Sequence, residues 1–106
     1  MLDHATENLR TGMEFIIANP SYHDGQTYYP FFHDAAKLLN MTKLYSSDGR
    51  HAGDVLQEIE HQMILIKHSL LYTHDKYDEQ LADYLANAIQ EVNVARYIET
   101  YEHHEV

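Results

Sequence analysis

The chain has 106 residues, no cysteine, and 17 acidic against 7 basic side chains, so its formal net charge is −10 with the nine histidines counted as neutral. This balance excludes binding to nucleic acid or to an anionic membrane through a basic patch. The absence of cysteine excludes disulfide frameworks, cysteine-ligated metal centres and thiol nucleophiles. A hydrophobic fraction of 44%, with nine tyrosines, is too high for a disordered acidic tail.

Length and composition predict one domain over residues 1–106. The segment Met1–His4 lacks the basic and apolar regions of a signal peptide. Unbroken apolar runs, such as Met63–Ile66, are far shorter than the roughly 20 residues that a membrane helix needs. Together with the absence of cysteine, these features predict a complete, soluble, cytoplasmic protein that does not bind membranes.

The first helical segment is predicted over about 3–19, with Asp3 as its N-cap. Apolar residues recur there every three or four positions, as one face of a helix requires: Leu2, Ala5, Leu9, Met13, Ile16 and Ile17. Pro20 disfavours helical geometry at Asn19, and Asp24-Gly25 is typical of a turn. We therefore expect a break between the first and second helices.

The second helical segment is predicted to begin near Pro30, because the missing N–H of proline costs nothing at a first helical position. Its broad apolar face continues to about Tyr45. A tight turn is predicted over 46–49, where Gly49 permits left-handed backbone geometry.

The third helical segment, predicted over about 52–73, has the clearest apolar stripe. Within an arc of roughly 100° it places Val55, Leu56, Ile59, Met63, Ile66 and Leu70. Ile64, Leu65 and Leu71 fall outside that arc. A helix that is apolar on more than one side is either central in its bundle or part of an oligomer interface, and from these extra positions we predict a homodimer.

The fourth helical segment, predicted over about 78–101, places on one face Leu81, Tyr84, Leu85, Ala88, Ile89, Val92 and Ala95. No strand-like alternation occurs in the sequence. The fold prediction is an all-α, compact four-helix bundle, mainly antiparallel, with short loops.

Catalytic motifs are missing from the sequence. It contains no glycine-rich phosphate loop and no Gly-x-Ser-x-Gly motif, and two of its four glycines lie in Asp-Gly pairs. We therefore predict that the protein is not an enzyme and needs no cofactor.

Histidine gives the one motif with possible metal chemistry. Glu58 and His61 form a Glu-x-x-His pair, which di-iron bundles use in two copies together with two further glutamates. Here there is one copy, and the periodicity places it with His68 opposite the core stripe, so no metal ligand is assigned. Two alternatives stay open: a metal-binding bundle with this face at an oligomer interface, and a histidine-driven response to pH.

Five aromatic residues lie near the break between the first and second predicted helices: Tyr22, Tyr28, Tyr29, Phe31 and Phe32. These rings either pack the loop onto the bundle or form an interface hot spot, where tyrosine is enriched. The interleaved lysine and arginine that single-stranded nucleic acid requires are missing, so no direct nucleic-acid binding is predicted.

The acidity is concentrated in the second half of the chain, since residues 1–53 have a net charge of −2 and residues 54–106 a net charge of −8. Carboxylates at the start of the fourth segment are favoured by the helix dipole, whereas later ones oppose it. An acidic face that persists to the C-terminus predicts a protein partner with a basic surface. The predicted contact residues are Asp78, Glu79, Asp83, Glu91, Glu99, Glu102, Tyr28 and Tyr29.

In size, charge sign and helical character the chain resembles the broad group of small, acidic, tyrosine-rich helical inhibitors that phages encode, some of which mimic DNA. The resemblance implies a non-catalytic protein that acts by protein–protein contact. Its expected role is that of an inhibitor or regulator of a nucleic-acid-handling protein, of phage or mobile-element type.

Overall fold

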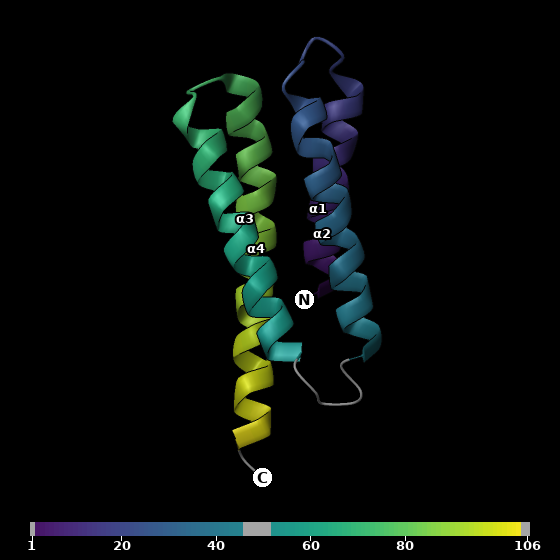
Figure 1. Ribbon diagram of the computed structural model, residues 1–106, viewed down its shortest axis with the longest axis vertical. Helices are drawn as coiled ribbons and strands as arrows, with labels where there is room; N and C mark the ends of the chain where they lie inside the picture. The colour runs from purple at the N-terminus through teal and green to yellow at the C-terminus, as the bar shows by residue number, and fades with distance from the viewer. Residues whose placement is uncertain (1, 46–51, 105–106) are drawn as a thin grey trace.

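A computed structural model describes the backbone of residues 2–45 and 52–104, and the side chains of 2–42 and 53–97. Within these residues the chain forms four helices and no strand: α1 (Leu2–Ala18), α2 (Gly25–Tyr45), α3 (Ala52–Tyr72) and α4 (Lys76–His104). Figure 1 shows two helical hairpins, α1–α2 and α3–α4, lying side by side. The predicted all-α four-helix bundle is confirmed, and the predicted turn at 46–49 lies outside the described residues.

The bundle is rod-shaped, with principal extents of 52 × 23 × 17 Å. Its radius of gyration is 14.4 Å, above the ~13 Å expected of an average domain of this length, because the helices run along one axis. α1 packs against both α2 and α4, and α3 packs against α4, whereas the seam between α2 and α3 is the least closely packed of the four. The α1–α2 and α3–α4 connections lie at the same end of the rod (Figure 1).

The core runs along the bundle axis and takes residues from every helix. Its largest fully buried apolar side chains are Leu9, Phe32, Leu39, Met63, Leu70, Leu81, Leu85 and Val92. The stripe predicted for the third helix supplies four buried residues, but Val55 is 39% exposed. Val55 lies at the edge of the stripe, beside the loosely packed α2–α3 seam, and this position explains its exposure.

α2 begins at Gly25 and not near Pro30, so the predicted start was wrong. The chain has already turned before the proline, because the N–H of Thr27 donates to the Asp24 carbonyl at 3.0 Å. Pro30 is the sixth residue of the helix, where it removes only the backbone hydrogen bond to Gln26. A side chain is not tolerated at Gly25, since a Cβ atom there would lie 2.8 Å from Cδ2 of Tyr22.

α4 begins at Lys76, two residues before the predicted start, because Asp75 caps it. The Asp75 carboxylate accepts from the N–H of Asp78 at 3.4 Å, and the Asp75 carbonyl accepts from the N–H of Glu79 at 2.8 Å. Before the cap, His74 has a φ of 56°, the left-handed geometry that commonly terminates a helix. The connection between α3 and α4 is therefore only three residues long.

Gly12, in the middle of α1, sets the distance between α1 and α2. The residue is buried, and a Cβ atom there would lie 2.7 Å from Cδ2 of Phe32 and in steric conflict with Cε2. Because glycine has no Cβ atom, the fully buried Phe32 ring packs directly on the α1 backbone. This contact joins residues 20 positions apart, and the α1 sequence pattern gave no sign of it.

We expect Gly12→Ala to lower the free energy of unfolding by up to about 2 kcal/mol. The added methyl group overpacks the Phe32 site at a cost of about 1–3 kcal/mol, and the higher helix propensity of alanine offsets about 1 kcal/mol of that cost. Gly53→Ala is the matched control, since no atom lies within 4 Å of a Cβ atom there. Urea unfolding of both variants is the measurement, and equal effects of the two substitutions would contradict this account of Gly12.

Candidate partner-binding site

The aromatic residues predicted as one group lie in different surroundings. Tyr22 and Phe32 are buried, whereas Tyr28, Tyr29 and Phe31 are half-buried. Packing of the loop onto the bundle is therefore observed for Tyr22, and Phe32 belongs to the core. Only the half-buried rings are accessible to a partner.

Tyr22 connects the two hairpins through the carboxylate of Asp78. The Tyr22 hydroxyl donates to Oδ1 of Asp78, and the Thr73 hydroxyl donates to Oδ2. The three residues come from the α1–α2 connection, the α3–α4 connection and the first turn of α4. Asp78 is 1% exposed, so the prediction that it faces a partner does not agree with the structure. In the first turn of α4, the Asp78 carboxylate faces the hydroxyl groups of Tyr22 and Thr73 and not the solvent.

The Tyr22 ring belongs to a group of four contacting rings, which is called here the aromatic end cluster: Phe15, Tyr22, Tyr77 and Tyr84. The Tyr22 and Tyr77 rings are stacked, with centroids 5.2 Å apart. The Phe15 ring contacts the other three, with centroid distances between 5.9 and 6.2 Å. Burial and the hydrogen bond to the Asp78 carboxylate both raise the pKa of Tyr22 well above its usual range.

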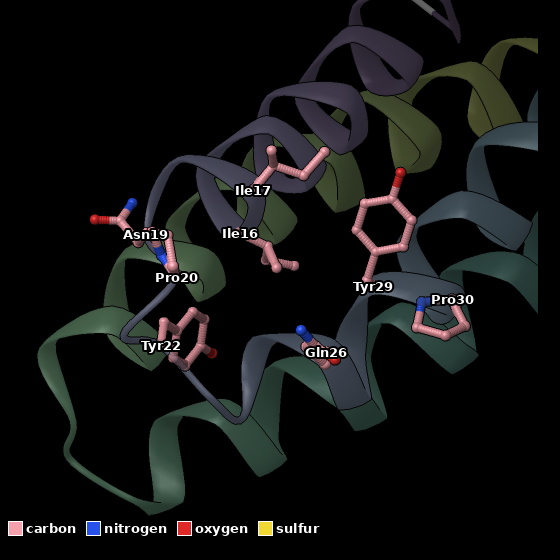
Figure 2. Close-up of a pocket in the computed structure, with 8 residues that line it drawn as sticks. All are labelled: Ile16, Ile17, Asn19, Pro20, Tyr22, Gln26, Tyr29 and Pro30. Atoms are coloured by element: carbon pink, nitrogen blue, oxygen red, sulfur yellow. The ribbon is translucent and has the colours of Figure 1, made fainter.

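Beside this cluster, α1 and α2 enclose an open hollow of about 380 Å³ (Figure 2). No charged side chain lines it, and its walls are formed by Ile16, Ile17, Asn19, Pro20, Tyr22, Gln26, Tyr29 and Pro30. Ile17, at its rim, is 66% exposed, which is unusual for a branched apolar side chain. The hollow has the size and apolar lining of a site for an apolar side chain or a small apolar ligand, and it holds no acid–base pair for catalysis.

The two tyrosines predicted to contact a partner do not share one site. Tyr29 forms a wall of the hollow between α1 and α2. Tyr28 lies on the other side of α2, where its hydroxyl is 3.5 Å from Oγ of Ser69 on α3. Successive residues of a helix point about 100° apart, and this rotation separates the two rings.

The acidic residues of α4 that were predicted to contact a partner do not all lie on one exposed face. Glu79 and Asp83 are exposed and one helical turn apart, so they share the outer face of α4. Glu91 is half-buried and lies about 80° around the helix from Asp83. Glu99 and Glu102 lie on helical backbone, but their side chains are outside the described residues.

Arg96 is the one lysine or arginine in the sequence from 77 to 106, and it bonds to Glu60 of α3. Its Nε and Nη2 atoms donate to the two carboxylate oxygens of Glu60, each at 3.3 Å. Asn93 donates to the same carboxylate at 3.4 Å. The positive charge of Arg96 is thus matched by an acid of α3. Sequence reasoning missed this pair, because its members are 36 residues apart.

The Glu-x-x-His motif lies on the outside of α3, as its spacing predicted. Glu58, His61 and His68 are all exposed. Over the part of the chain that the structure describes, no group of three or more histidine, aspartate or glutamate side chains is placed to hold a metal ion. The alternative of a metal shared between two copies stays a prediction.

Comparisons with protein-family models, curated proteins and solved structures found no match to this chain. Among the described residues, no helix is long and apolar enough to cross a membrane.

Burial of Tyr22 and its hydrogen bond to Asp78 together make the free energy of unfolding fall at alkaline pH. Since the folded-state pKa of Tyr22 lies above the unfolded value of about 10, its contribution is complete below pH ~10 and is lost as pH rises further. We expect this residue alone to reduce the free energy of unfolding by up to about 1.4 kcal/mol per pH unit above pH ~10.

Tyr22→Phe should flatten this alkaline slope and lower stability at neutral pH by about 1–3 kcal/mol, because the buried Asp78 carboxylate loses a donor. Tyr72→Phe serves as the control, since Tyr72 is 85% exposed. Urea unfolding at a series of pH values is the measurement. An unchanged slope in Tyr22→Phe would show that the hydrogen bond does not have this effect.

Proposed function

We propose that this chain is a non-catalytic interaction protein that binds a partner protein with a basic surface. The observation that supports the proposal most is the charge of the segment 77–106, which holds seven carboxylates and a single arginine. That arginine is held by Glu60, while Glu79 and Asp83 remain exposed on one face of α4. The hollow beside Tyr29 adds an apolar contact area of the kind that interface hot spots use.

The partner class follows from this charge. An acidic helical surface attracts the basic grooves with which proteins bind nucleic acid, so the chain would inhibit or regulate a nucleic-acid-handling protein in the cytoplasm. Some of the small acidic helical inhibitors that phages encode mimic DNA, and the size and charge sign of this chain support the same role here. The chain itself is not expected to bind nucleic acid or membrane.

The spacing of the carboxylates limits how closely α4 imitates DNA. Glu79 and Asp83 are separated by a rise of about 6 Å along the helix axis, and Glu91 follows about 12 Å further on. Phosphates on one DNA strand follow each other every ~3.4 Å. The proposed surface is therefore sparser than DNA, and its binding should depend less steeply on salt than the binding of DNA to the same partner.

The test is affinity capture from cell lysate at low salt and at about 0.5 M NaCl, with double-stranded DNA as competitor. We expect the captured proteins to bind nucleic acid and to be released by salt and by DNA, because screening weakens contacts between exposed charges. The double variant Glu79→Gln/Asp83→Asn should weaken binding about two- to thirtyfold, the range for two exposed ion pairs.

The matched control is Glu7→Gln/Glu14→Gln, which removes the same charge from exposed positions on α1. This variant should bind almost like the original chain, because it leaves α4 unchanged. Partners that stay bound at about 0.5 M NaCl, or equal losses in the two double variants, would contradict an acidic α4 interface.

The proposal includes self-association as a dimer through the apolar positions of α3 outside the core. Leu65 and Leu71 are exposed and Ile64 is half-buried. We expect light scattering at tens of micromolar to give twice the 12.4 kDa mass of one chain, and Leu71→Ser to shift it toward one. A single-chain mass for the unmodified protein would rule out the dimer.

A further inference from the structure

An apolar groove runs along the seam between α2 and α3, on a different side of the bundle from the outer face of α4. It has a volume of about 210 Å³ and is lined by Phe31, Asp34, Ala35, Leu38, Glu58, Ile59 and Gln62. The seam is open because α2 and α3 pack less closely than the other neighbouring helices. In Figure 1 both helices lie on the side of the bundle that faces the viewer.

Exposed apolar side chains extend this groove toward the end of α2. Leu38, in the groove wall, is 44% exposed. Met41 lies one turn beyond it on α2, and Val55 lies one turn before Ile59 on α3. Both are also about 40% exposed (41% and 39%). From Phe31 to Met41 the apolar strip is about 15 Å long, which equals nearly three turns of a helix.

The edges of the groove are acidic on both sides. Asp34 lies on the α2 edge and Glu58 on the α3 edge, and both are exposed. Gln62 donates to Glu58 at 3.2 Å, and the ring of His33 lies 3.2 Å from Asp34. No lysine or arginine is among the lining residues. An apolar floor between two carboxylates is complementary to an apolar strip flanked by positive charges.

We propose that this groove binds a short amphipathic helix of a partner protein, about three turns long, with apolar side chains on one stripe and lysine or arginine on either side. This is the helix-in-groove mode of recognition, in which anchors at i, i+3, i+4 and i+7 enter the groove. A second copy of this chain is the alternative occupant, and the oligomeric state of a groove variant distinguishes it from a basic helix. The proposal does not depend on the α4 surface.

The probe for the test is a labelled synthetic peptide of about 14 residues, with leucine at i, i+3, i+4 and i+7 and lysine on both flanks. Two further peptides serve as controls: one with glutamate in place of lysine, and one with the same composition in an order that removes the stripe. Fluorescence anisotropy measures binding to the full chain. We expect the basic amphipathic peptide to bind at least tenfold more tightly than either control.

Two groove variants separate the apolar from the charged contribution. Leu38→Asn should weaken binding by about tenfold, because it removes an apolar wall of the groove. Asp34→Asn/Glu58→Gln should weaken it by about two- to thirtyfold and reduce its salt dependence. The matched control Glu7→Gln/Glu14→Gln removes equal charge from exposed positions on α1 and should leave peptide binding unchanged.

Equal losses in the groove variant Asp34→Asn/Glu58→Gln and the α1 control would overturn the proposal, because the attraction would then come from net charge alone. Equal binding of the three peptides would also overturn it, because neither the apolar stripe nor the lysine flanks would then be recognised. A dimer mass in light scattering that Leu38→Asn converts to a single-chain mass would also overturn it, since a second copy would then occupy the groove. Failure of the α4 surface to bind its partner would leave the peptide result unaffected, so the two proposals are tested separately.

Discussion

The hydrogen bond between Tyr22 and Asp78 is the interaction on which the rest of this bundle depends. It joins the α1–α2 connection to the first turn of α4, 56 residues further along the sequence, and it does so at a buried site. A buried carboxylate without donors is costly, so Asp78 requires the hydroxyls of Tyr22 and Thr73, and these in turn hold the ends of α1, α3 and α4 together.

The seam between α2 and α3 is packed less closely than the other three contacts between neighbouring helices. α1 is held on one side by the packing of Phe32 on Gly12, and on the other by contacts with α4. α3 is tied to α4 by the bidentate pair of Glu60 with Arg96. No comparable polar pair among the described residues closes α2 onto α3, where Tyr28 and Ser69 are 3.5 Å apart. Leu38 and its neighbours therefore remain exposed along this seam.

Exposed carboxylates occur on two separate surfaces of this molecule. On α4, Glu79 and Asp83 form an exposed acidic face, and the one arginine of that segment is matched by Glu60. Between α2 and α3, Asp34 and Glu58 border an apolar groove. We propose that both surfaces bind partners with positive charge, the first through long-range attraction and the second also through shape. The two proposed sites would give a chain with a net charge of −10 two different ways to recognise a basic partner.

The sequence by itself determined the fold class, because the three- and four-residue spacing of apolar side chains identifies each helix, and turn residues separate them. It also located the acidic half of the chain. The predicted helix starts were less accurate. The start of α2 was predicted near Pro30, because proline suits a first helical position, but the turn from Asp24 to Thr27 begins the helix earlier. Only the tertiary structure decided that Asp78 is buried and that the Phe32 ring packs on Gly12. It also decided that Arg96 donates to Glu60. Local periodicity reports which face of a helix is apolar, whereas these contacts depend on which helices become neighbours, and that depends on packing between residues far apart in the chain.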